Sequence, residues 1–111
     1  DGKQERDFTY IDDIARGTIM AMNPLGYEII NLGSDRPVVL ADLIKMIEEY
    51  LGKTARIQYA PRHTADVLAT WADIGCARSL LGWLPQVSVE DGVARTIQWY
   101  EDNRNWAKDI R

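Results

Sequence analysis

The chain is poor in residues that cross-link small domains or bind metals. Among its 111 residues there is a single cysteine, Cys76, and a single histidine, His63. One cysteine forms no internal disulfide, and these two side chains alone cannot supply the three or four ligands of a zinc-type site. The sequence therefore predicts a protein of a reducing, cytoplasmic compartment with no metal centre. We expect Cys76 to be a small core residue.

Basic charge and long apolar runs are also scarce. Lysine and arginine total 13 against 17 aspartates and glutamates, which gives a formal net charge of −4. That balance disfavours a surface that neutralises a nucleic-acid backbone. No apolar run approaches the roughly 18 residues of a membrane span, and no signal peptide is visible. We therefore expect a soluble protein without nucleic-acid or membrane partners, folded as one domain of residues 1–111.

The hydrophobic pattern predicts a small mixed α/β domain of short strands and about four helices. Strands are expected at 6–11, 27–33 and 55–61, and helices at 13–22, at 40–51, between the cap Asp73 and Gly82, and after the cap Ser88. The short strands and separate helices do not form three regular crossover units, so a complete doubly wound sheet is not expected. The polar tail after about residue 101 is expected to fray.

The stretch ERDFTYIDDIARG, residues 5–17, joins a strand pattern to a helix start. Asp12 and Asp13 follow the strand pattern directly. Aspartate at a helix start accepts hydrogen bonds from the free N–H groups and favours the positive end of the helix dipole. We interpret both aspartates as this helix start, with Ile14 and Ile19 on the apolar face that points to the core.

Two motifs that resemble functional sites are better explained by structure. Gly52-Lys53-Thr54 is not a phosphate-binding loop, because Ile47 occupies the place of the required first glycine and the motif follows a helix. The tryptophans offer stacking surfaces for a base or a sugar, but large aromatics spread over several elements more often pack in the core and at its rim. The second interpretation is favoured for the four tryptophans, Trp71, Trp83, Trp99 and Trp106.

Basic side chains stand at the ends of two predicted strands. Arg6 opens the first strand, and Arg62 with His63 follows the third. If those strands are neighbours, both groups reach the same edge of the sheet. Because a planar guanidinium suits bidentate contact with phosphate or carboxylate, these residues form a candidate anion site.

The order of these segments resembles one known family. RDFTYIDDIARG, YEIINLG and the run from DVLATWAD through LGWLP to IQWY are similar, in the same order, to segments of the extended short-chain dehydrogenase/reductases, the NAD-dependent nucleotide-sugar epimerases and dehydratases. Nearly the whole chain is covered. Among the subfamilies, DVLATWAD most resembles the UDP-glucuronate 4-epimerases.

The resemblance implies a fold and a set of substrate contacts. The chain would be the C-terminal portion of an extended Rossmann-type epimerase, without the dinucleotide-binding domain. Arg6 would contact the diphosphate of a UDP-sugar, while Asp7 would be structural. Further contacts to the nucleotide sugar would come from the later loop and its end, from Arg62 or His63, Asp66 and Thr70.

The catalytic motifs of that family are missing from this chain. It has no G-x-x-G-x-x-G loop, and no tyrosine is followed by lysine four positions later. In the family, NAD takes up a hydride while that tyrosine removes a hydroxyl proton, so both elements are needed. We therefore expect an excised C-terminal fragment that is not catalytic alone and binds no NAD, although its parent enzyme would.

The fragment hypothesis also predicts exposed apolar surface. Residues 27–33 and the helix at 13–22 would pack partly on the missing N-terminal Rossmann domain, so the chain alone is expected to self-associate. Two alternatives stay open at this point. One is the same part of a related sugar-nucleotide dehydratase or decarboxylase, and the other is a protein-interaction module without any turnover.

Overall fold

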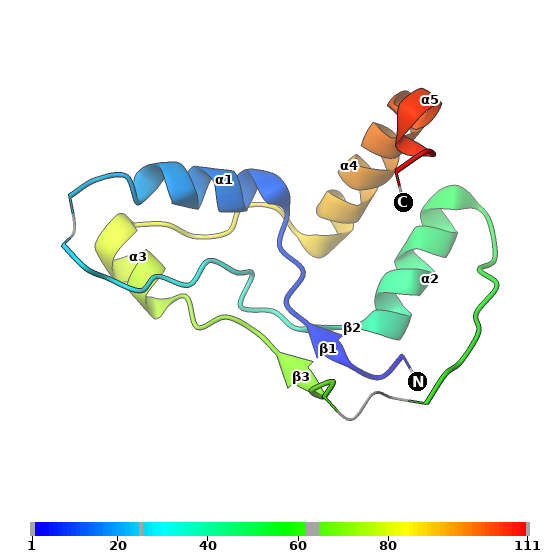
Figure 1. Cartoon of the computed structure of the whole chain (residues 1–111), viewed down its shortest axis with the longest axis horizontal. Helices are drawn as coiled ribbons and strands as arrows, with labels where there is room; N and C mark the ends of the chain where they lie inside the picture. Colours follow the sequence, from blue (N-terminus) through cyan, green and yellow to red (C-terminus); the bar gives the residue numbers. More distant parts are fainter. Residues whose placement is uncertain (1, 25, 62–64, 111) are drawn as a thin grey trace.

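The computed structural model describes residues 2–24, 26–61 and 65–110. The elements are β1 (Glu5–Arg6), α1 (Ile11–Met20), β2 (Val38–Val39), α2 (Leu40–Leu51), β3 (Ala69–Thr70), α3 (Gly75–Leu81), α4 (Val89–Asp102) and α5 (Arg104–Ala107). Figure 1 shows α1 beside α3 at one end of the molecule, α2 with α4 and α5 at the other, and the strands below and between them. The predicted mixed α/β class is confirmed. A fifth helix, α5, lies where the sequence predicts a frayed tail.

The sheet is small, and its central strand is β1. The strand order is β2-β1-β3. β1 runs antiparallel to β2, with Arg6 opposite Val38, and parallel to β3, with Arg6 opposite Thr70. This register places two predicted site residues, Arg6 and Thr70, next to each other.

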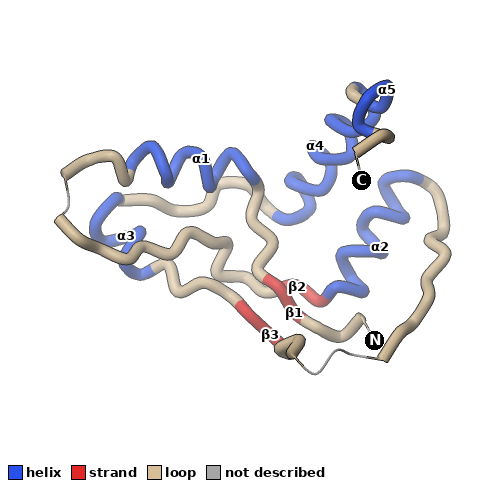
Figure 2. Tube along the Cα trace, in the orientation of Figure 1, coloured by secondary structure: helices blue, strands red, loops and turns tan. Residues whose placement is uncertain are grey.

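Two of the three predicted strands do not form. Residues 27–33 and 55–61 are loop (Figure 2), and Tyr27 and Ile29 are 90% and 72% exposed. A strand requires a neighbour that completes its hydrogen-bond ladder, and both sides of β1 are already taken by β2 and β3. The predictions of strands at 27–33 and 55–61 are therefore wrong for this chain, and the strands β2 and β3 form at positions where the sequence predicts none.

The helix ends are predicted more accurately. α2 spans Leu40–Leu51 as expected, and Gly52 closes it with a φ of 60° in the left-handed region. α3 likewise ends at Gly82, with a φ of 63°. At the start of α4, the Ser88 hydroxyl accepts a hydrogen bond from the Asp91 N–H at 3.1 Å. These three predictions are confirmed.

The predicted orientation of α1 is wrong. Its buried face carries Asp13 and Gly17, whereas Ile19 and Met22 of the expected apolar face are 67% and 80% exposed. Gly17 permits this packing, because a Cβ there would lie 2.7 Å from the Leu32 side chain. Ile19 therefore points to solvent, whereas Ile14 is half-buried and Met20 packs against the core.

The core lies between α1 and α3. Trp83 and Ala77 are fully buried, and Ile74 is 3% exposed. The partly buried side chains around them are Met20, Ile30, Leu32, Ala72 and Leu81. Cys76 is exposed, which corrects its predicted core position: α3 turns Ala77 toward the core, and the preceding side chain then points away.

The prediction that the tryptophans pack in the core and at its rim is confirmed for the core by Trp83. Trp83 is buried, but Trp71, Trp99 and Trp106 are 58%, 48% and 53% exposed. Trp99 and Trp106 pack edge to face with ring centroids 5.6 Å apart. Across residues 2–24, 26–61 and 65–110, no helix has the length and apolar character to span a membrane.

Candidate functional site

A groove of about 520 Å³ opens beside β1 and β3. The segment 30–33, whose Ile30 and Leu32 also pack against the core, lines it together with the two strands. The lining side chains and backbone belong to Arg6, Asp7, Ile30, Asn31, Leu32, Gly33, Thr70, Trp71 and Ala72. The volume falls within the range of about 300–1,000 Å³ typical of small-molecule sites. Its lining combines one cation, Arg6, one carboxylate, Asp7, amide and hydroxyl groups, and an exposed aromatic ring.

Arg6 supplies the positive charge of this groove. Its Nη2 forms an ion pair with the Asp66 carboxylate, and its Nη1 donates to the Glu5 carbonyl at 2.7 Å. Both partners of the ion pair remain about 30% exposed, so water screens the pair and it contributes little to stability. A guanidinium carries five donors, which leaves donors of Arg6 available to an anion.

The structure brings together three of the five predicted site residues. Arg6 pairs with Asp66, and Thr70 lies beside Arg6 in the parallel register of β1 and β3. Arg62 and His63 lie outside the described residues. The contact of any of these side chains with a nucleotide remains a prediction.

Asp7 ties the walls of the groove to one another. Its carboxylate accepts hydrogen bonds from the Ser34 N–H at 2.8 Å, the Asp35 N–H at 3.2 Å and the Ala72 N–H at 3.0 Å. The Ser34 hydroxyl also donates to it. One side chain thus joins β1 to the turn at 34–35 and to the residues after β3. This arrangement agrees with the structural role expected for Asp7.

The same hydrogen bonds keep Asp7 ionised. Burial acts to raise the pKa of this carboxyl, but the Ser34 hydroxyl and the backbone N–H groups of Ala72, Ser34 and Asp35 outweigh it and hold the pKa below its ordinary value. Asp7 is therefore a permanent anion at neutral pH and an acceptor only. Its chemistry suits an anchor for the groove and does not suit a general acid.

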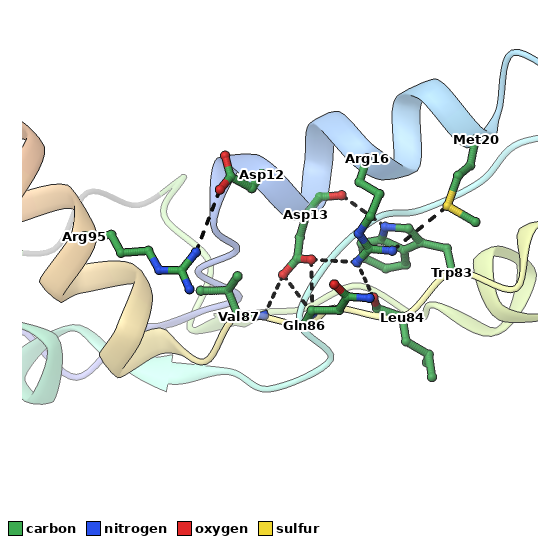
Figure 3. A network of polar contacts seen from close by, with 9 residues as sticks. All are labelled: Asp12, Asp13, Arg16, Met20, Trp83, Leu84, Gln86, Val87 and Arg95. Carbon is green, nitrogen blue, oxygen red and sulfur yellow. Dashed lines mark hydrogen bonds and ion pairs between the residues drawn. The ribbon is translucent and has the colours of Figure 1, made fainter.

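A second carboxylate, Asp13, anchors α1 to the segment before α4 (Figure 3). Its side chain is 2% exposed and accepts from the Gln86 and Val87 N–H groups, each at 2.9 Å. The Arg16 guanidinium donates to the same carboxylate at 2.6 Å. The Asp13 carbonyl accepts from the Trp83 indole N–H at 3.0 Å. Four contacts thus converge on one residue of α1.

This network replaces the capping role predicted for Asp13. No side chain caps the start of α1, which begins one residue after Tyr10, although both aspartates lie in its first turn. Burial acts to raise the pKa of Asp13, but Arg16 and the N–H groups of Val87 and Gln86 hold it below the ordinary value. The Asp13–Arg16 pair has the local i,i+3 spacing, but the sequence contains no local signal for the bonds from Gln86 and Val87, which lie more than 70 positions away.

Known proteins similar to this chain include several UDP-sugar epimerases and a UDP-glucuronic acid decarboxylase of Danio rerio, which is 31% identical over 89% of this chain and 24% of its own. The UDP-glucuronate 4-epimerase of Thermodesulfobacterium geofontis is 51% identical over 112 residues, which cover all of this chain and 35% of that protein. The solved UDP-glucuronic acid 4-epimerase of Bacillus cereus, in complex with UDP-glucuronic acid and NAD, is 37% identical with a TM-score of 0.84, over 93% of this chain and 34% of its own.

A further similar protein gives the same picture. The epimerase of Methanothermobacter thermautotrophicus is 32% identical with a TM-score of 0.91, over 98% of this chain and 33% of its own. No family model matches the sequence. The chain spans about a third of the length of the relatives it matches, and the matched stretch is a C-terminal part of extended short-chain dehydrogenase/reductase epimerases. The resemblance predicted from the sequence is confirmed.

Proposed function

We propose that this chain is the substrate-binding part of an NAD-dependent UDP-sugar 4-epimerase, with UDP-glucuronate as its substrate. The observation that carries the proposal is that Arg6 and Thr70 line one groove side by side, while Asp66 holds the Arg6 guanidinium from outside its lining. A diphosphate would bind to the guanidinium, since fork-like N–H donors match phosphate oxygens. The names of the similar proteins supply the substrate class.

The hydride chemistry belongs to a part of the protein that this chain does not contain. NAD sites of this type need a glycine-rich loop at a helix start, and the sequence has neither that loop nor the tyrosine-lysine pair. The residues present therefore do not fit NAD. The proposal assigns NAD and the catalytic base to an N-terminal domain of a longer, cytoplasmic parent enzyme. The test is whether the full reading frame encodes both and its product converts UDP-glucuronate to UDP-galacturonate.

The substitution Arg6→Ala is expected to weaken UDP binding by this chain about tenfold. The loss corresponds to the removal of one charge-assisted contact of about 1.5 kcal/mol. Arg6→Lys should recover only part of it, because an ammonium lacks the planar fork. The measurement is an NMR titration with UDP. Arg95→Ala, which removes another cation that is 53% exposed and stacks on Tyr10, is the matched control and should leave the affinity unchanged. Equal affinities for wild type and Arg6→Ala would contradict the proposed diphosphate contact.

The exposed apolar side chains favour a missing domain as partner. Ile29 on the segment 27–33 is 72% exposed, Ile19 on α1 is 67% exposed, and Met22 just after α1 is 80% exposed. Large apolar surface left exposed often marks an interface. We therefore propose that these residues pack on the N-terminal domain of the parent enzyme.

The isolated chain is expected to self-associate through this surface. Sedimentation should show a concentration-dependent dimer for wild type, and Ile29→Lys should shift the distribution to monomer because it charges the interface. Leu80→Lys on α3, where the side chain is 43% exposed, is the control and should leave the dimer in place. A strictly monomeric wild type over a wide concentration range would contradict this interface.

One observation favours a second candidate function. Trp99 and Trp106 form an exposed edge-to-face pair near the C-terminal end of α4, and large aromatics are enriched at protein interfaces. An interaction module without turnover would use such a pair. Tight binding of a protein partner, with no response to UDP, would favour this alternative over the epimerase proposal.

A further inference from the structure

Trp71 is a large side chain in the lining of the groove, and it has no part in the proposed diphosphate contact. It directly follows β3 and is 58% exposed, in contrast to the fully buried Trp83. Its side chain has no hydrogen bond or ring contact to any other described residue. Trp71 nevertheless lines the same groove as Arg6 and Thr70. More than half of the Trp71 surface is therefore open to a ligand.

The order of polar groups along the groove indicates which part of a nucleotide sugar would meet this ring. Asp66 holds the guanidinium of Arg6 but does not line this groove, whereas Thr70 lines it directly beside Arg6. If Arg6 takes the diphosphate and the sugar fills the groove, the nucleoside lies on the Asp66 side of Arg6 and the sugar lies beside Thr70. Trp71 is the next residue beyond Thr70, at the sugar end.

We propose that Trp71 is the platform on which the hexose ring of the UDP-sugar packs, a role that rests on the proposed function. One face of a pyranose presents C–H groups with partial positive charge, and these match the negative face of an indole. Asn31 lies across the groove and donates weakly to the Asp73 carbonyl at 3.4 Å, which leaves its side-chain oxygen available to a sugar hydroxyl. Trp71 is therefore a specificity residue for the sugar and contributes nothing to recognition of the nucleotide.

The test compares UDP with UDP-glucuronate as ligands of the same variants, by NMR titration of the chain. Wild type should bind UDP-glucuronate more tightly than UDP. Trp71→Ala should weaken UDP-glucuronate binding about fivefold, the value for a loss of about 1 kcal/mol of aromatic contact, and should leave the affinity for UDP within about twofold. Trp71→Phe should keep most of the difference in affinity between UDP-glucuronate and UDP. Trp106→Ala removes a tryptophan exposed to a similar extent but outside the groove, and should change neither affinity.

The outcomes separate this inference from the function on which it rests. If wild type binds neither UDP nor UDP-glucuronate, the epimerase proposal fails and the role of Trp71 fails with it. If both ligands bind and Arg6→Ala weakens both, but Trp71→Ala weakens both equally or neither, the substrate assignment stands and the platform is overturned. Equal affinities of wild type for UDP and UDP-glucuronate would also overturn it.

Discussion

Replacing Asp13 with alanine is expected to destabilise the chain by about 3–5 kcal/mol. The substitution leaves the N–H groups of Gln86 and Val87 and the Arg16 guanidinium without their acceptor in a site where the carboxylate was 2% exposed. Breaking a buried ion pair by removing one partner costs about this much, because the other partner stays desolvated. Urea unfolding followed by circular dichroism measures the loss. Since small domains are stable by only about 5–15 kcal/mol, the variant should be close to unfolding at 37 °C.

Asp12→Ala is the matched control for this loss. Asp12 is the preceding residue on the same turn of α1, but it is 68% exposed and 3.9 Å from Arg95. Its removal should change stability by less than about 0.5 kcal/mol, as for most surface ion pairs. Similar losses for the two variants would show that the charge of the first helical turn, and not the buried network, carries the effect.

The pH dependence of stability gives a second signature of Asp13. Its pKa is lower in the folded chain than in the unfolded chain, so the carboxylate stabilises the fold fully above the unfolded value of about 4. The contribution is lost as the pH falls through the lowered folded value. Wild type should therefore lose stability below about pH 4, and Asp13→Asn should lose less over the same range. The slope that remains in Asp13→Asn is expected to come largely from Asp7, whose pKa is lowered as well.

Gly33→Ala is expected to cost about 3 kcal/mol. A Cβ at this position would lie 2.4 Å from the Ala72 Cβ and 2.6 Å from the Asp7 carboxylate. Overpacking of this kind typically costs about 1–3 kcal/mol, and the clash also disturbs the Asp7 hydrogen bonds that join the groove walls. Thermal unfolding measures the loss, and the UDP titration should show a parallel decrease in affinity.

Two further variants make the Gly33 prediction sharper. Gly75→Ala at the start of α3 adds a Cβ that meets only the Asp73 carboxylate, at 3.1 Å, and helix propensity offsets the contact, so stability should change by about 0.5 kcal/mol or less. The double variant Gly33→Ala/Ala72→Gly removes the nearest clashing atom and should recover part of the loss. If the double variant recovers no stability, the clash with the Ala72 Cβ is not the cause of the loss in Gly33→Ala.

The helix ends could be predicted from the sequence because they depend on local chemistry. Gly52 and Gly82 adopt the left-handed conformation that few other residues tolerate, and Ser88 caps α4 within three residues of its own position. The strands could not be predicted in this way. Residues 27–33 have a strand-like composition but no partner in the described chain, whereas β2 and β3 form because β1 offers them its two sides.

The candidate site could be predicted only in part. The resemblance to known sequences identifies Arg6, Asp66 and Thr70, and the structure shows that they are neighbours. The bonds from Gln86 and Val87 to Asp13 could not be found, because their donors are backbone N–H groups, which every residue but proline carries. The exposure of Trp71 was also invisible, since a tryptophan in a sequence does not reveal whether another segment covers it.

The contacts that shape the groove have a consequence for how the chain folds. Arg6 and Asp66 are 60 positions apart, and Asp7 reaches Ala72 across 65 positions. Contacts of such high sequence separation form late, because the entropy of closing a long loop is lost before the contact is made. During refolding, α2 and α4 are therefore expected to gain their helical signal first. Ligand binding would return only in the slowest phase, so it would report the completion of the fold.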